Sequence, residues 1–396
     1  MSSVDRGDMA TEKMLPIMSL LFILFLLEGC ESTIGPAQRL ISTGDTSTSV
    51  RIGWIGPLTG GAAQYGVPEL NAAKLAVEDL NAKGGIKGHP LELVVEDGKC
   101  DGATTTTAAT KLIEVDQVNY ISGGHCSTES MTIAPISDPK KVLIIAGATA
   151  AAKFSGISKY AFRTYPSAID MYSRLAKFAY GKGTRTVVTF NEQKDGPQSI
   201  IDTFAQVFTE SGGTVLGKEV FAPGSTDFRT QLLKIRELNP DAMMISVQSP
   251  DAASLIIKQM NELSINIQIY SDALVVTKST YEKSGGLLPA TAIGATGHIN
   301  PEKSPETKQF LELYQNRYGE FSVDPFFATE GYDQVKILAG LIESCWNDTD
   351  CARNTLINTP WNGISGVYHF NDKGDSNPFF GIVRIEGGKV LYEFES

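Results

Sequence analysis

The segment GHCSTES, residues 124–130, gathers the side chains that are most able to do chemistry. A nucleophile at Cys126 or Ser127 would need a positioned base, but the segment is not G-x-S-x-G. His125 is the nearest base, and adjacent residues at a strand end point apart. The four histidines show no metal-ligand spacing: His89, His125, His298 and His369. We therefore expect no catalytic nucleophile and no metal here, and GPLTGG (56–61) is no nucleotide fingerprint, so we expect no cofactor.

The same segment fits an anion site better. Ser127 and Thr128 stand where a helix is predicted to begin, directly after the apolar stretch VNYISGG. Hydroxyl groups and the unpaired N–H groups of a helix N-terminus bind anionic oxygens. The alternative is that Ser127 only caps its own helix, and the residue type does not separate the two.

These residues depend on a strand–helix alternation that begins at residue 50. Apolar strands alternate with helical patterns, which predicts parallel sheets covered by helices on both faces. A first series runs from residue 50 to about 180, and a second begins with TRTVVTFN (184–191), so we expect two lobes. Helices at 305–318 and 329–344 follow, and the chain ends in strands with a hairpin turn at Gly387–Gly388.

Ligands of such sheets lie beyond the carboxyl ends of the strands. The segments expected there are rich in glycine, hydroxyl and other small residues: 56–66, 123–130, 146–150, 191–196, 248–251 and 271–273.

Composition bounds the function. The chain has 396 residues with 42% hydrophobic and 20% charged, which is typical of a globular protein of two domains. The net charge of −11 argues against nucleic acid and anionic membrane surfaces as partners.

The N-terminus is predicted to be an export signal. Residues 15–27 are apolar but shorter than a membrane span. LEGC follows and ends at Cys30, which resembles a bacterial lipoprotein cleavage site, although Glu28 departs from that pattern. We expect residues 1–30 to be the signal peptide, Cys30 to carry lipid and residues 31–49 to be a linker.

Export changes how the cysteines are interpreted. Without Cys30, four cysteines remain, and an even number in an oxidising compartment indicates disulfides. Cys345 and Cys351 are close in sequence, which leaves Cys100 with Cys126. Free buried thiols are the alternative for either pair.

Several stretches resemble the leucine/isoleucine/valine-binding proteins, the extracytoplasmic receptors of amino-acid ABC importers. They are the run from VRIGWIGPLTGG through NAKGGIKG to LELVVED, then GGHCSTES, AGAT, FRTYPS and the late NGISGVYHFNDKGD. The resemblance implies an α/β fold of two Rossmann-like lobes (the type I periplasmic-binding-protein fold), joined by three crossover segments. Lobe I would be 50–166 plus 298–358, and lobe II would be 167–297 plus 359–396. The crossovers would lie near 164–167, 297–300 and 358–363.

The resemblance also implies a ligand site. In the first lobe, Tyr65, Ser127 and Thr128 and the segment Gly147, Ala148 and Thr149 would hold an amino acid, chiefly by its carboxylate. It also implies that Cys126 pairs with Cys100.

The second lobe departs from the family pattern. Asp195 stands where the family has a tyrosine, Gln248 replaces another tyrosine, and Ala273 occupies the position of the acid that neutralises the ligand ammonium. A buried ammonium needs a countercharge, so Asp195 or Asp272 would supply it, or the ligand lacks an ammonium. Asp272 as a turn cap and Asp195 as an exposed rim residue are the alternatives.

We therefore expect a monomeric, exported solute-binding protein, periplasmic or lipid-anchored at the outer face of the cytoplasmic membrane. It would capture an amino acid, or a related small carboxylate or amide, by hinge closure and deliver it to ABC permease subunits, without being an enzyme. The alternative is a sensor that presents its closed form to a signalling partner.

Overall fold

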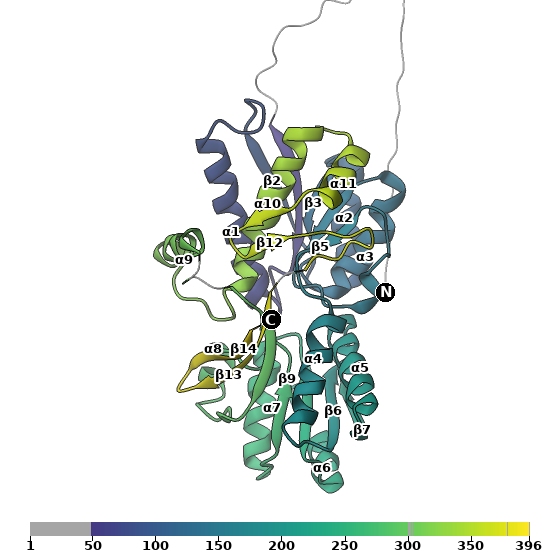
Figure 1. Cartoon of the computed structure of the whole chain (residues 1–396), viewed down its shortest axis with the longest axis vertical. Coiled ribbons are helices and arrows are strands. Elements are labelled where there is room, and N and C mark those ends of the chain that lie inside the picture. Colours follow the sequence, from purple (N-terminus) through teal and green to yellow (C-terminus); the bar gives the residue numbers. More distant parts are fainter. Residues whose placement is uncertain (1–48, 300–301, 303, 378, 396) are drawn as a thin grey trace, which may run out of the picture. The chain divides into compact units, whose positions relative to one another are not determined.

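A computed structural model describes residues 49–299, 302, 304–377 and 379–395, and it contains two large β-sheets (Figure 1). The predicted signal peptide, Cys30 and the linker up to residue 48 lie outside the described residues. In the described chain the first sheet has five parallel strands in the order β2-β1-β3-β4-β5. These strands are β1 (Val50–Gly56), β2 (Leu91–Asp97), β3 (Tyr120–Gly123), β4 (Leu143–Ala146) and β5 (Ala161–Arg163).

The second sheet has the order β14-β13-β10-β9-β8-β6-β7 among the described residues. Strands β6 to β10 pair in parallel, whereas β13 pairs antiparallel with both β10 and β14. The strands are β6 (Thr186–Glu192), β7 (Thr214–Phe221), β8 (Ala242–Ser246), β9 (Gln268–Ser271), β10 (Ile293–Gly297), β13 (Phe380–Glu386) and β14 (Lys389–Glu395). The predicted two-lobe α/β fold is confirmed.

Helices connect the strands of each sheet because every parallel pair needs a crossover. They are α1 (Ala63–Ala82), α2 (Gly102–Thr110), α3 (Ser127–Ser137), α4 (Ala168–Gly181), α5 (Asp195–Glu210), α6 (Arg229–Leu238), α7 (Pro250–Glu262), α8 (Lys278–Lys283), α9 (Pro305–Tyr318), α10 (Phe326–Cys345) and α11 (Thr349–Asn358). Helical turns η1 (Lys111–Val115), η2 (Asp138–Lys140) and η3 (Ala152–Phe154) complete them. Helix α10 lies along α1 (Figure 1).

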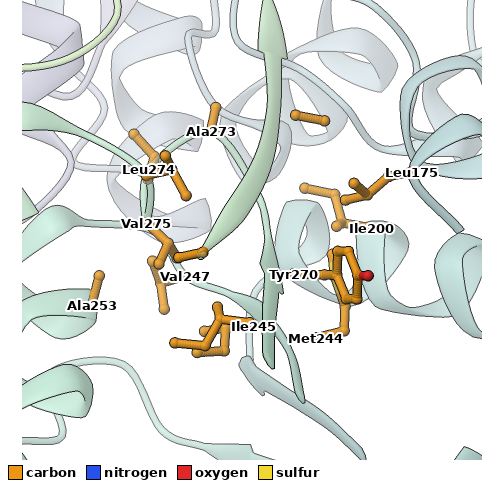
Figure 2. Close-up of a cluster of buried hydrophobic side chains, with 14 of the residues drawn as sticks. Leu175, Ile200, Met244, Ile245, Val247, Ala253, Tyr270, Ala273, Leu274 and Val275 are labelled. Atoms are coloured by element: carbon orange, nitrogen blue, oxygen red, sulfur yellow. The ribbon is translucent and has the colours of Figure 1, made fainter. Parts of the chain in front are cut away.

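Each sheet has its own core. Ile52 and Trp54 of the inner strand β1 are buried, in keeping with a parallel sheet that is covered on both faces. In the second sheet, the strand residues Met244 and Tyr270 pack with Leu175 and Ile200 of the covering helices (Figure 2). This core continues to residues just beyond the strands, which places the loops after β8 and β9 on a rigid base.

The third change of lobe falls later than predicted. The short antiparallel strands β11 (Trp361–Gly363) and β12 (Gly366–Tyr368) were expected in lobe II. Tyr368 and Phe370 instead pack in the core of the first sheet, beside Phe162. The chain reaches the second sheet only at β13, because these aromatic side chains are buried against the first.

Candidate functional site

The segment 124–130 forms the turn from β3 into α3. Cys126 is the residue before the helix, and no side chain caps this helix end. Ser127 is 2% exposed, and its Oγ accepts a hydrogen bond from the Ala151 N–H (3.2 Å) rather than capping its own helix. The first N–H groups of α3 therefore keep their capacity to bind an anion.

His125 is a core residue. It is fully buried, stacks on Trp54 with ring centroids 4.8 Å apart, and its Nδ1 contacts the Glu69 carboxyl group. Burial lowers the pKa of His125 to about 4 and raises the pKa of Glu69 well above its usual range. Both directions favour a neutral pair, with the proton on Glu69, so His125 is no base for Cys126.

The cysteines lie in the predicted pairs. The Cα atoms of Cys100 and Cys126 are 5.9 Å apart, and those of Cys345 and Cys351 are 5.6 Å apart, with each pair of sulfurs at bonding distance. The first pair lies directly beside Ser127. Among the described residues there is no cluster of three His, Cys, Asp or Glu side chains that could hold a metal ion.

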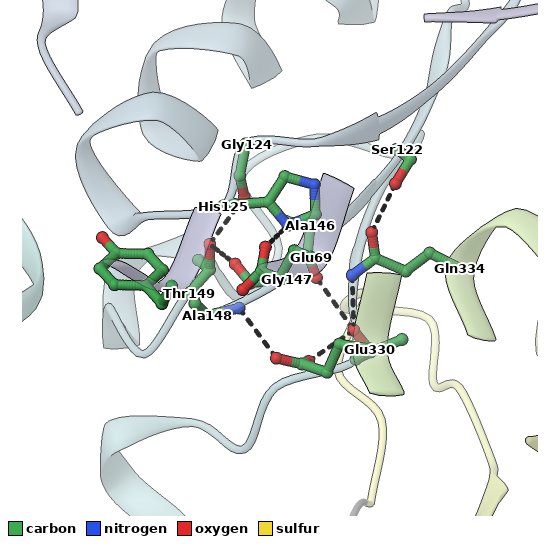
Figure 3. A network of polar contacts seen from close by, with 12 residues as sticks. Glu69, Ser122, Gly124, His125, Ala146, Gly147, Ala148, Thr149, Glu330 and Gln334 are labelled. Carbon is green, nitrogen blue, oxygen red and sulfur yellow. Dashed lines mark hydrogen bonds and ion pairs between the residues drawn. The ribbon is translucent and has the colours of Figure 1, made fainter. Parts of the chain in front are cut away.

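Buried carboxyl groups support the loops that end at the site. Glu129 accepts hydrogen bonds from the N–H groups of Cys100 (2.9 Å) and His125 (3.0 Å). Burial raises its pKa to about 7. Glu330 of α10 accepts from the Ala148 N–H (3.2 Å) and the Thr164 hydroxyl (2.7 Å), as Figure 3 shows. Burial raises the pKa of Glu330 well above its usual range.

The loop that follows β4 is held from its other side by Arg163. The Arg163 guanidinium donates to the carbonyl oxygens of Thr149 (3.1 Å) and Ala151 (2.8 Å) and pairs with Asp375 at 2.6 Å. Ala148 has a φ of 40°, a left-handed conformation that a non-glycine residue adopts only when its surroundings impose it. The loop is thus fixed before any ligand arrives.

A cavity of about 410 Å³ lies between these loops and the second lobe. Its lining comes from both lobes: Tyr65, Ser127, Ala148, Ala150, Tyr165 and Phe327 on one side, and Tyr172, Gly196, Pro197, Ile200, Val247, Gln248, Asp272, Ala273 and Leu274 on the other. Figure 2 shows Val247, Ala273 and Leu274 at the edge of the second core. No arginine, lysine or histidine lines the cavity.

Five of the nine predicted ligand residues line this cavity: Tyr65, Ser127, Ala148, Gln248 and Asp272. The other four lie outside its lining. Thr128 and Asp195 bond each other across the lobes at 2.8 Å. The Thr149 hydroxyl lies within hydrogen-bond distance of Gly147 O (2.8 Å), to which it donates, and of Ser130 Oγ (3.1 Å). A side chain at Gly147 would meet His125 and Gln334. Thr149 and Gly147 therefore shape the loop instead of touching the cavity.

Asp272 is both a cap and a wall of the cavity. It accepts from Ser246 Oγ and the Val247 N–H (both 2.7 Å) and from the Leu274 N–H (2.9 Å). Burial raises its pKa to about 6 against the effect of these donors, so the carboxyl is largely ionised at neutral pH. It is the negative charge in the lining of the cavity.

Apart from Tyr65, the aromatic part of the lining was not predicted. Tyr165 follows β5, Tyr172 lies in α4 and Phe327 begins α10. The Tyr165 ring stacks on the Phe327 ring with their centroids 5.9 Å apart. The Phe327 ring also contacts the Tyr65 ring, with 5.5 Å between the centroids. The rule that ligand residues directly follow the strands of a parallel sheet does not find residues within helices. For Tyr165, the sequence signal that could have found it was its position in FRTYPS, where the first crossover was expected.

The second lobe presents a helix end opposite Ser127. Helix α5 also begins without a side-chain cap, and its second residue is Gly196. A Cβ atom on Gly196 would lie 3.1 Å from Ser127 Oγ. The N-termini of α3 and α5 therefore lie against each other at the border of the cavity. Within the described ranges, no helix is long and apolar enough to span a membrane.

Comparisons with known proteins agree with this architecture. Residues 49–387 match the family model described as periplasmic binding protein. The Leu/Ile/Val-binding protein of Escherichia coli K12 is 24% identical over 84% of this chain and 90% of its own. A solved leucine-binding protein from Thermotoga maritima has a TM-score of 0.80 and 26% identity over 87% of this chain and 98% of its own. A solute-binding protein of an ABC transporter from Rhodopseudomonas palustris BisB5, solved with 3,4-dihydroxybenzoic acid, has a TM-score of 0.77 and 22% identity over 88% of this chain and 96% of its own. This chain therefore belongs to the periplasmic binding protein family, in the group of the leucine/isoleucine/valine-binding proteins, whose members are solute-binding proteins and not enzymes.

Proposed function

We propose that the protein captures an amino acid in the cavity between its lobes and delivers it to an ABC importer. The observation that carries this proposal is the pairing of two uncapped helix N-termini, those of α3 and α5, with one ionised carboxyl group in the same lining. Helix N-termini favour a carboxylate, and a buried carboxylate favours an ammonium group. A zwitterion satisfies both.

Each end of the ligand has a binding group in this proposal. The Ser127 hydroxyl accepts from Ala151 and keeps its own hydrogen to donate to the ligand carboxylate. Asp272 supplies the countercharge that the family pattern has one residue later, at Ala273. The rings of Tyr65, Tyr165, Tyr172 and Phe327 would surround the ligand side chain.

An aromatic acid without an amine is the second candidate ligand, favoured by these rings. Solute-binding proteins of similar fold from Rhodopseudomonas palustris were solved with benzoate and with hydroxylated benzoates. A simple anion would, however, enter a lining that contains the Asp272 charge and no basic residue, which is unfavourable in a low-dielectric site. The charge balance therefore ranks the amino acid first.

The cellular setting completes the proposal. Relatives in this family are periplasmic, and residues 1–30 would direct export, with lipid on Cys30 and disulfides at Cys100–Cys126 and Cys345–Cys351. Ligand would close the lobes about the crossovers, and the closed form would dock on permease subunits.

Leucine and 4-methylpentanoate, which is leucine without its amine, test the ligand class. We expect the purified protein to bind leucine or a larger amino acid with a clear rise in melting temperature, and the amine-free acid at least tenfold more weakly. Asp272→Asn should remove this difference, whereas Asp333→Asn, a buried acid away from the cavity, should keep it. Tighter binding of benzoate than of all amino acids would reject the proposal in favour of the aromatic acid.

A further inference from the structure

A second cavity lies between the lobes directly behind the first. Its empty space, counted together with the solvent at its open mouth, is about 820 Å³, and Gln248 lines both cavities. We call it the outer cavity. Gly61 and Lys99 border it from the first lobe, and Glu192 and Ser249 border it from the second.

The partition between the two cavities is thin. The Gln248 amide donates to the Tyr65 hydroxyl at 2.7 Å, and the Tyr65 hydroxyl lies 3.9 Å from the Cys100 sulfur. Gln248 is thus the side chain that the two cavities share, and one hydrogen bond holds it against Tyr65. Gln248 replaces a larger tyrosine of the family pattern, so the gap behind it is a feature of this chain.

Glu192 is a buried carboxyl group with unused capacity in the outer cavity. It is 7% exposed, and its Oε2 accepts from the Gln248 N–H at 2.9 Å. No described residue donates to its Oε1. The neighbouring Lys194 acts on Glu192 through its charge, while its ammonium donates to the Cys100 carbonyl oxygen at 2.9 Å across the lobes. Glu192 Oε1 can therefore still accept a hydrogen bond from a ligand.

The outer cavity also holds an available donor. The Lys99 side chain lines it, and no ion pair or hydrogen bond joins the Lys99 ammonium to another described residue. The aspartate in this wall, Asp251, is already paired with Lys283 (2.5 Å) and Gln64 (2.9 Å). Among its polar groups, the outer cavity thus offers the free carboxylate oxygen of Glu192 and the ammonium of Lys99, which together match the N–H and the oxygen of a neutral amide.

We propose that the outer cavity is a subsite for the amide-bearing side chain of a polar amino acid, with the amide N–H on Glu192 and its oxygen on Lys99. This inference rests on the proposed function, because the amino-acid head and the first part of its side chain would occupy the first cavity, and only the terminal amide would reach the outer cavity. It names the class of side chain that the second lobe, with its departures from the family pattern, is built to accept. Water alone in the outer cavity is the competing explanation.

Matched ligand pairs test the subsite in the purified wild-type protein. L-glutamine is compared with L-glutamate, which has the same shape but no N–H donor, and the longer L-citrulline with L-norleucine. We expect the amide of at least one pair to bind about tenfold more tightly than its partner, the difference that one hydrogen bond to a charged group provides. Leucine serves as the reference for the first cavity.

The variant Glu192→Gln assigns the effect. It keeps an acceptor for the Gln248 N–H, and its own amide no longer discriminates against glutamate. We expect the preference for the amide to fall at least tenfold while leucine affinity stays within twofold of wild type. Asp333→Asn, which removes another buried carboxylate, should leave the preference unchanged.

The outcomes separate the two proposals. Binding of leucine without a preference for either amide overturns the subsite and leaves the proposed function intact. A preference for the amide that survives Glu192→Gln also overturns it. Absence of binding by every amino acid tested rejects the proposed function itself, and the subsite with it.

Discussion

Replacement of Glu330 by alanine would release the loop that lines the cavity from the segment that connects the lobes. Glu330 accepts from Ala148 in that loop and from Thr164 in the first crossover, next to Tyr165. The residue is fully buried on α10. Its carboxyl group therefore joins three parts of the site that are far apart in the sequence.

The size of the effect follows from these contacts. Alanine leaves the Ala148 N–H buried without its acceptor, which costs about 1–3 kcal/mol. The Thr164 hydroxyl loses less, because Ala146 O lies 3.3 Å away and the Gln334 amide lies 2.9 Å away. With the cavity left by the side chain, we expect a loss of about 2–4 kcal/mol. Glu330→Gln keeps an acceptor for Ala148 and should lose about 1 kcal/mol or less.

Asp333→Ala is the matched control. Asp333 lies one turn further along α10, is equally buried, and accepts from the N–H groups of Ile364 (2.7 Å) and Ser365 (3.0 Å), away from the cavity. Denaturant unfolding measures the stability of each variant, and hydrogen exchange reports the loop at residues 147–151. We expect both alanine variants to lose comparable stability.

The two variants should differ at the site. In Glu330→Ala, exchange in residues 147–151 should accelerate about tenfold or more and ligand affinity should fall about tenfold, with Glu330→Gln close to wild type in both. In Asp333→Ala, the exchange rate of residues 147–151 and the ligand affinity should both stay near their wild-type values. Equal exchange in the loop for the two alanine variants would refute the reasoning, because it would make Glu330 an ordinary buried residue.

Three further predictions concern the site and its supports. Ser127→Ala should weaken ligand binding about tenfold to a hundredfold at unchanged unfolding free energy, measured by calorimetry; unchanged affinity would exclude Ser127 as a ligand group. The unfolding free energy should fall between pH 5 and pH 7, by up to about 1.4 kcal/mol per pH unit for each titrating group. Burial raises the pKa of Glu129 to about 7 and that of three aspartates to about 6, so stability present below pH 4 is lost as the pH rises through these values. His125, with its pKa lowered to about 4, opposes this and loses stability as the pH falls from 6.5 to 4; a rise in stability from pH 5 to 7 would contradict the balance. Reduction of Cys100–Cys126, which closes a loop of sequence separation 26, should cost about 3 kcal/mol; an unchanged denaturation midpoint under reductant would mean that no disulfide forms.

The sequence predicts the fold well because apolar periodicity reports local structure. The strand–helix alternation, the hairpin at Gly387–Gly388 and the position of Ser127 at the start of a helix all follow from spacing and residue type. The predicted change from lobe I to lobe II at residue 359 is too early in the chain. Tyr368 and Phe370 are apolar residues that would fit the core of either lobe. Only their burial against Phe162 decides it.

The site was predicted in part for the same reason. Residues that directly follow strands, such as Gln248 and Asp272, are found by a topological rule. Phe327 and Glu330 reach the site from α10, on the far side of the second crossover, and Glu69 from the middle of α1. No local pattern marks a helix residue as facing a cavity instead of a core, since both positions are buried. Thr149 was predicted to bind the ligand because it follows a strand, but it does not line the cavity. Its hydroxyl is hydrogen-bonded to neighbouring backbone and side-chain oxygens instead.

The most direct test of the account is calorimetric titration of the purified protein with the common amino acids, alongside Gly196→Ala. Gly196 is the second residue of α5, in helical backbone that alanine adopts readily, and the added methyl group would lie 3.1 Å from Ser127 Oγ, which lines the cavity. We predict one saturable site for at least one amino acid in the wild type and a loss of affinity of at least tenfold in Gly196→Ala. Undiminished binding by this variant would show that the ligand does not lie between the N-termini of α3 and α5, and would contradict the central claim.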